Sequence, residues 1–211
     1  VWAKENTRDA IFDALKRRET FATSGPCIAP RFFGGWHIPA DICSTPNLAK
    51  AGYQHGIPMG GVLASKNKPD ARPRFVVAAN ADPGTTGAPG HPLQRIQIIK
   101  GWVGSDGSFH QSVIDVAGNA DSGATVDPLS CNAEGEGFAS LCGVWEDAEF
   151  NPQHDAAYYA RVVENPSCRW STRMCLSLPE DQRPDGCDNP RIPKVIQERA
   201  WTAPIWFDSS R

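Results

Sequence analysis

Charged side chains are concentrated on two segments near the C-terminus that the sequence predicts to be strands. Arg161 and Glu164 lie on the first segment (156–165), and Glu198 and Arg199 lie on the second (197–207). Successive side chains of a strand point to opposite faces, so each segment places some charge on a face that is otherwise core. Buried ion pairs between strands would account for these charges. Lining of a ligand cleft is the alternative, with Arg161, Glu164, Arg169 and Glu198 as its candidate residues.

No complete catalytic site or metal site is visible in the sequence. The five histidines are scattered in or beside predicted loops, without the short spacing that metal sites use. They are His37, His55, His91, His110 and His154. The chain has no G-x-S-x-G frame and no Gly-Lys-Ser/Thr phosphate loop. We therefore expect no metal, no cofactor and no catalysis from this segment alone.

Seven tryptophans raise the alternative of a non-catalytic module that binds carbohydrate, because indole faces stack on sugar rings. Most of them fall in or beside predicted strands, where tryptophan more often packs in a core. They include Trp36, Trp102, Trp145, Trp170, Trp201 and Trp206. A purely structural module is the third interpretation.

Composition favours a loop-rich β protein. The 211 residues include 19 glycines and 18 prolines, which punctuate strands and oppose long helices. The formal net charge is −3, without the basic excess of a nucleic-acid-binding protein. No apolar run approaches the ~20 residues of a membrane helix. Neither a nucleic-acid nor a membrane partner is expected.

Seven cysteines indicate a disulfide-bonded, exported protein, because none has the spacing of a zinc site. Cys131 and Cys142 flank a short polar loop, and so do Cys175 and Cys187. Each short loop predicts a local disulfide. The number is odd, so at least one thiol stays free or pairs elsewhere. The partners of three cysteines remain open: Cys27, Cys43 and Cys168.

The predicted elements are one helix followed by about seven strands. The helix covers 6–19, with Asn6 or Thr7 as its cap and a thin apolar stripe that needs a packing partner. Asp106-Gly107 predicts the turn of a hairpin. A long loop is expected at 39–61. The predicted strands cover 28–36, 74–79, 93–103, 109–116, 139–146, 156–165 and 197–207. This pattern favours an immunoglobulin-like β-sandwich.

Six phrases, among them Ser24-Gly25-Pro26 and Pro58-Met59-Gly60-Gly61, occur in an order that resembles a known family. They lie within 1–8, 14–26, 31–36, 58–61, 158–170 and 197–206. Together they resemble the C-terminal third of a large bacterial family catalogued as a domain of unknown function. That family resembles the PHP (polymerase and histidinol phosphatase) metallohydrolases.

The resemblance implies that residues 1–24 are the last helix and strand of a PHP-like α/β barrel, and that 25–211 form an appended sandwich. The barrel would be the partner of this chain in the same protein. It would hold divalent zinc, manganese or iron and hydrolyse a phosphate ester, or another ester or amide bond, of a small-molecule substrate. PHP proteins begin their ligand set with His-x-His, which does not occur here. Cys27 stands where the resemblance leads us to expect an arginine, which favours a disulfide between Cys27 and Cys43. The expected location is periplasmic or secreted.

Overall fold

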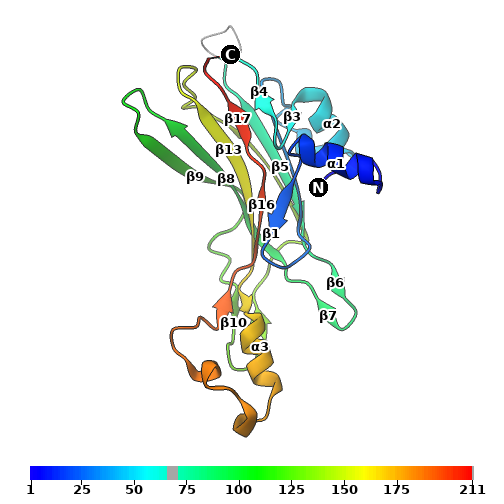
Figure 1. Ribbon diagram of the computed structural model, residues 1–211, viewed down its shortest axis with the longest axis vertical. Coiled ribbons are helices and arrows are strands. Elements are labelled where there is room, and N and C mark those ends of the chain that lie inside the picture. The colour runs from blue at the N-terminus through cyan, green and yellow to red at the C-terminus, as the bar shows by residue number, and fades with distance from the viewer. Residues whose placement is uncertain (66–70, 211) are drawn as a thin grey trace.

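The computed structural model describes residues 1–65 and 71–210 and is mostly β (Figure 1). Its strands form two large antiparallel sheets and three two-stranded ribbons. Many of the additional strands are only two or three residues long and carry no periodic signal, which is why the prediction of about seven strands was too low. The helices are α1 (Arg8–Lys16), α2 (Leu48–His55) and α3 (Trp170–Ser177) in the described part of the chain.

The larger sheet is organised around β13 (Ala156–Glu164), which pairs along one side with β8 (Leu93–Val103). Two shorter strands share the other side of β13, namely β16 (Arg199–Thr202) and β17 (Ile205–Phe207). The edges are β9 (Phe109–Gly118), β1 (Phe21–Thr23) and β4 (Val62–Leu63). Among the strand pairs of the described residues, β4 and β17 alone run parallel.

The smaller sheet has the order β12 (Ser140–Glu146), β5 (Arg74–Asn80), β2 (Ala29–Gly35) and β3 (Ile57–Pro58). Phe32 and Phe75 from this sheet belong to the same hydrophobic core as Ile98 and Tyr158 from the larger sheet. The rings of Phe75 and Tyr158 are stacked, with centroids 4.2 Å apart. The two sheets therefore share one core.

Helix α2 covers the outer face of the smaller sheet, in the region for which the sequence predicted only a loop. The side chain of Asn47 caps the helix by accepting a hydrogen bond from the N–H of Lys50. Gly52 lies directly against the buried ring of Phe33, and a Cβ atom at Gly52 would come 2.5 Å from that ring. Close approach of helix and sheet explains a glycine in mid-helix.

Helix α1 is shorter than the predicted 6–19 but has the predicted cap, because the Thr7 hydroxyl accepts a hydrogen bond from the N–H of Ala10. Ala14 is fully buried. Phe12 and Leu15, by contrast, are 63% and 52% exposed. One face of the helix is thus packed and another shows large apolar side chains to solvent.

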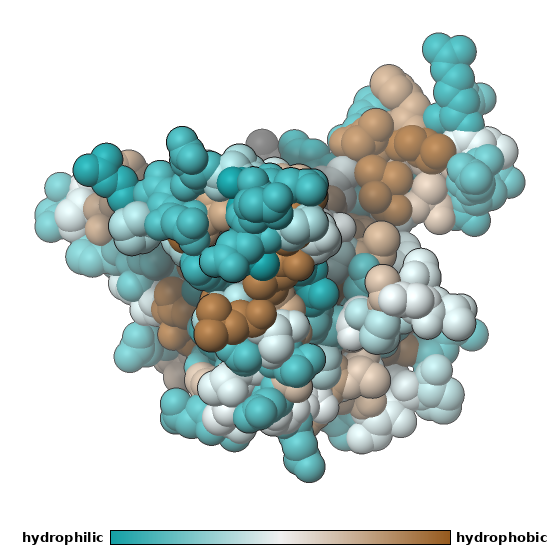
Figure 2. Space-filling view, turned by 90° about the horizontal axis from the view of Figure 1, so that it is seen from below, coloured by the Kyte–Doolittle hydropathy of each residue, from teal (hydrophilic) through white to brown (hydrophobic). Residues whose placement is uncertain are grey.

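Beyond the sheets, the chain forms a second, smaller lobe that the sequence did not predict (Figure 1). It leaves at β14 (Ser167–Cys168), continues through α3 and returns at β15 (Val195–Ile196), which pairs with β14. Figure 2 views the molecule from this end, where hydrophobic residues appear within a largely hydrophilic surface. Leu129, Met174 and Ile192 are exposed apolar side chains of this region.

The remaining short elements are two ribbons and three 3-10 turns. The ribbons are β6 (Gly84–Thr85) with β7 (Ala88–Pro89), and β10 (Thr125–Val126) with β11 (Ala133–Glu134). The turns are η1 (Ile42–Ser44), η2 (Glu180–Gln182) and η3 (Asp185–Asp188). No helix within 1–65 and 71–210 is long and apolar enough to cross a bilayer.

Three disulfides link these parts. Cys175–Cys187 closes the short loop that the spacing predicted. The predicted pair Cys131–Cys142 is wrong, because Cys142 lies on β12 and bonds to Cys43 while Cys131 bonds to Cys168. The pairing of Cys27 with Cys43 is wrong as well, since Cys27 is an exposed free thiol.

Candidate functional site

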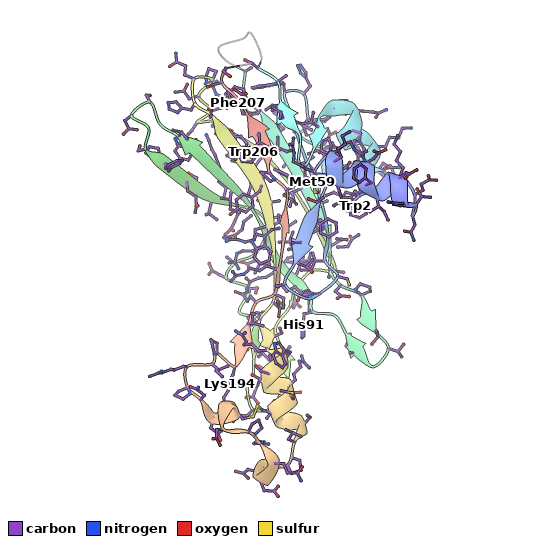
Figure 3. All side chains as sticks on the ribbon, viewed as in Figure 1. Trp2, Met59, His91, Lys194, Trp206 and Phe207 are labelled. Atoms are coloured by element: carbon purple, nitrogen blue, oxygen red, sulfur yellow. A yellow bond between two sulfur atoms is a disulfide. The ribbon has the colours of Figure 1, made fainter. Side chains whose placement is uncertain are left out.

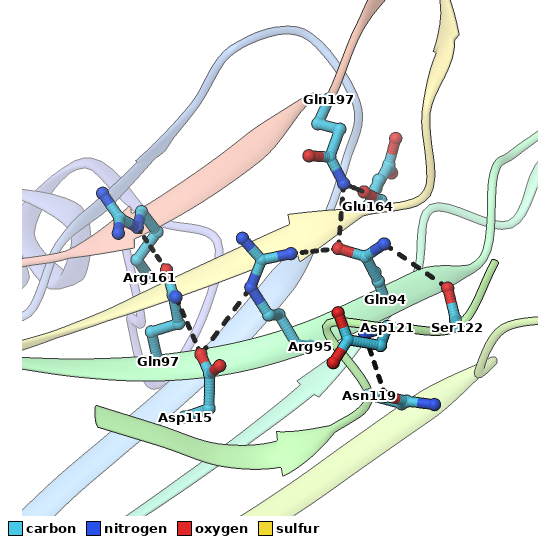
Figure 4. Close-up of polar contacts among 10 residues, drawn as sticks. All are labelled: Gln94, Arg95, Gln97, Asp115, Asn119, Asp121, Ser122, Arg161, Glu164 and Gln197. Carbon is cyan, nitrogen blue, oxygen red and sulfur yellow. Dashed lines mark hydrogen bonds and ion pairs between the residues drawn. The ribbon is translucent and has the colours of Figure 1, made fainter. Parts of the chain in front are cut away.

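A continuous chain of polar side chains connects β13, β8 and β9 and leads to Glu164 (Figure 4). Arg161 donates from Nε to Gln97 Oε1 at 2.7 Å, and Gln97 donates from Nε2 to Asp115 Oδ1 at 2.7 Å. The same Asp115 oxygen lies 3.6 Å from Nε of Arg95, which also bonds to the side chain of Gln94. Arg161 is therefore a member of an ordered polar network, not an isolated charge.

The network ends at the last residue of β13. Gln197 donates from Nε2 to Gln94 Oε1 at 2.9 Å and to the main-chain oxygen of Glu164 at 3.0 Å. The N–H of Glu164 donates to the main-chain oxygen of Glu198 at 3.0 Å. Two of the four candidate residues, Glu164 and Glu198, are thus brought side by side.

Glu164 is the most unusual ionisable group of the cluster. Its side chain is 1% exposed, and its Oε1 atom has no hydrogen-bond partner among the described residues. Burial, together with the nearby carboxylates of Asp82 and Glu198, raises the pKa of Glu164 to about 7. A carboxyl group that titrates near neutral pH can both give and accept a proton under ordinary conditions.

The two neighbouring carboxylates have partners of their own. Asp82 accepts from the N–H of Cys27 at 2.6 Å and from that of Gly84 at 2.8 Å, and these bonds lower its pKa. Glu198 accepts a hydrogen bond from the hydroxyl of Ser24. Both carboxylates accept hydrogen bonds, whereas Oε1 of Glu164 has no partner among the described residues, so the proton is retained most readily at Glu164.

Arg169 lies beyond β14 and shares no hydrogen bond with the other three candidates in the described structure. Its Nε atom is buried without a partner, and its N–H donates to the main-chain oxygen of Lys194 at 3.0 Å. Asn165 likewise has a buried Oδ1 atom without a partner. Three unpartnered polar atoms thus fall within 164–169. This is unusual, because buried polar groups in proteins normally have hydrogen-bond partners.

Sequence reasoning missed the glutamines and the aspartates of this network. Gln97 lies within the long apolar run of β8, and its polarity on an otherwise buried strand was the available signal. Asp82 had no signal beyond its position in a turn. No group of three His, Cys, Asp or Glu side chains in the described ranges is arranged to hold a metal ion.

A protein-family model described as a protein of unknown function (DUF3604) matches residues 1–209. No curated protein and no solved structure matches the chain.

Proposed function

We propose that the chain, which belongs to the DUF3604 family, is the C-terminal β-sandwich and the last barrel helix of an exported, PHP-like, metal-dependent hydrolase. The common core of the two antiparallel sheets supports an immunoglobulin-like sandwich as the architecture of 25–211. The ordered phrases that resemble the family, and through it the PHP enzymes, support the parent class. The proposal rests on that analogy for the chemistry, since fold alone does not establish function.

The observation that carries the proposal is the exposed apolar face of α1. Phe12 and Leu15 are exposed although the helix is anchored to the domain, with the Arg18 side chain donating to the main-chain oxygen of Gly60 at 3.0 Å. Large apolar side chains gathered on one helix face mark an interaction surface. A neighbouring barrel in the same protein, with α1 as its last helix, would cover this face.

The catalytic metal belongs to the barrel in this proposal. The described residues do not fit a metal centre, so no step is assigned to a metal in this chain. In the parent, a divalent zinc, manganese or iron ion would supply an activated water for ester or amide hydrolysis. Arg161, Arg169 and Glu198 would contribute from this domain by shaping the cleft for a small-molecule substrate, and the buried Glu164 would act through its neighbour Glu198.

Export to the periplasm or out of the cell is part of the proposal. The three disulfides support it, because such bonds persist in oxidising compartments and are rare in reducing ones.

The intact gene product provides the test. We expect it to contain bound divalent metal by mass spectrometry and to hydrolyse p-nitrophenyl esters in a chelator-sensitive manner, whereas residues 1–211 do neither. Phe12→Ser should lower the Tm of the intact protein by several degrees and leave that of residues 1–211 unchanged. The adjacent exposed variant Asp13→Ser is the matched control. An intact protein without metal, or one that tolerates Phe12→Ser, would contradict the proposal.

A further inference from the structure

The outer face of the larger sheet has a groove of about 490 Å³ near the C-terminal ends of β8 and β17. Its floor consists of Gly101 and Ala157, which face each other on paired strands. Trp206, the register partner of Ala157, forms one wall. Phe109, at the start of β9, lines the groove as well. Trp206 lies at the end of the molecule opposite the small lobe that contains Lys194 (Figure 3).

The groove is open because its floor residues are small. A Cβ atom added at Gly101 would have a single neighbour within 4 Å, the main-chain oxygen of His110 at 3.9 Å. Packing therefore does not require glycine at this position. The aromatic walls remain accessible, since Phe109 is 87% and Trp206 is 47% exposed. Two exposed aromatic side chains beside a floor of small residues form a preformed binding site for an apolar group.

Two carboxylates line the groove. Asp155 and Asp208 both line it, and no lysine or arginine lines it within 1–65 and 71–210. Oδ1 of Asp155 accepts from the hydroxyl of Ser209 at 2.7 Å and from its N–H at 2.8 Å. These two hydrogen bonds lower the pKa of Asp155, the bond from the hydroxyl having the larger effect, and favour the ionised carboxylate. Asp208 accepts from the hydroxyl and the N–H of Ser210.

We propose that this groove binds an organic cation, an ammonium group carried by an apolar body. Aromatic faces attract a cation that lies within about 6 Å of the ring centroid, and carboxylates add charge complementarity. The carbohydrate alternative suggested by the tryptophan content is a separate outcome of the binding test below. The site is separate from the Glu164 cluster and does not depend on the proposed hydrolase parent.

Three ligands of similar shape and different charge test the proposal by isothermal titration calorimetry. They are 2-phenylethylammonium, 2-phenylethanol and phenylacetate. We expect the cation to bind at least tenfold more tightly than the alcohol, with no measurable binding of the anion. Equal affinity for cation and alcohol, or a preference for phenylacetate or for cello-oligosaccharides, would overturn the proposal.

Two variants locate the binding. Gly101→Leu fills the floor from a position where a Cβ atom meets nothing closer than 3.9 Å, and Trp206→Ala removes a wall. Each should weaken binding of 2-phenylethylammonium at least tenfold. Trp170→Ala removes a tryptophan that is 70% exposed on α3 and should leave the affinity unchanged. Asp155→Asn should reduce the preference for the cation over the alcohol. Thermal melting followed by circular dichroism verifies that each variant is folded. Undiminished binding by folded Gly101→Leu would exclude this groove.

Discussion

Glu164 is a carboxyl group that the fold places away from water without giving its Oε1 atom a partner in the described structure. By contrast, another buried carboxylate, that of Asp147, is compensated by its partners. It lies 2.6 Å from Nζ of Lys100 and accepts a hydrogen bond from Tyr158 at 2.7 Å. A paired charge stabilises a fixed geometry, whereas an unpaired one favours the neutral form. Glu164 is therefore the residue whose ionisation is linked most directly to folding.

This linkage gives stability a defined pH dependence. Below about pH 4.5 the Glu164 carboxyl is protonated in both folded and unfolded chains, and it has no effect. As pH rises from 4.5 through 7, the unfolded chain ionises first and stability falls. A pKa raised from 4.5 to about 7 corresponds to about 3 kcal/mol, and above pH 7 the loss is complete.

Glu164→Gln removes this dependence. We expect its free energy of unfolding, relative to the wild type, to increase by about 3 kcal/mol between pH 4.5 and pH 8 in urea titrations. Glu134→Gln, an exposed change on β11, serves as the control and should follow the wild type. Parallel pH profiles of Glu164→Gln and the wild type would show that this carboxyl is not the linked group.

At the scale of the element, α2 illustrates how tertiary contact reverses a local preference. Alanine is favoured over glycine in a helix by about 1 kcal/mol. Here the ring of Phe33 occupies the space that a methyl group on Gly52 would need. Over-packing a well-filled contact typically costs 1–3 kcal/mol, so the steric effect outweighs helix propensity.

Gly52→Ala should therefore destabilise the protein by about 1–2 kcal/mol, measured by chemical denaturation. The exposed change Lys50→Ala on the same helix should stay within about 0.5 kcal/mol of the wild type. Phe33→Leu, combined with Gly52→Ala, should show a favourable coupling, because the smaller side chain releases the clash. A stabilised Gly52→Ala variant would mean that the helix moves away from the sheet at little cost.

Elements with a strong local signal were predictable, and those held by distant contacts were not. The β8–β9 hairpin follows from two apolar runs around Asp106-Gly107. Helix α3 has no capping side chain at Arg169. It is anchored by the hydroxyl of Thr172, which donates to the main-chain oxygen of Lys194 at 2.9 Å. Such long-range anchors leave no trace in a short window of sequence. For the same reason Glu164 and Glu198 were recognisable as candidates, while the electrostatic effect of Asp82 on Glu164 was not.

Across the whole molecule, the disulfides differ in the length of chain that they close. Cys43–Cys142 joins residues 99 apart and connects the turn before α2 to the smaller sheet. Cys175–Cys187 joins residues 12 apart within the small lobe. In the chain-entropy account the longer closure restricts the unfolded state more, by about 2 kcal/mol for these lengths.

Removing Cys43–Cys142 by a double alanine variant should thus cost about 4–5 kcal/mol, and removing Cys175–Cys187 about 3 kcal/mol. Urea unfolding of both variants, each with the other disulfides intact by mass spectrometry, measures the difference. The reverse order would indicate that contacts within the lobe, and not loop closure, dominate the stabilisation.

The small lobe begins and ends on one antiparallel ribbon, since Ser167 pairs with Ile196 and Cys168 pairs with Val195. Its two ends are therefore neighbours, and Cys131–Cys168 fixes the ribbon to the turn between β10 and β11. A segment with adjacent ends can be lengthened, shortened or replaced while the two strands that carry it, β14 and β15, keep their register. A change in the length of the stretch between β14 and β15 should accordingly leave the strand pairing of the two large sheets intact.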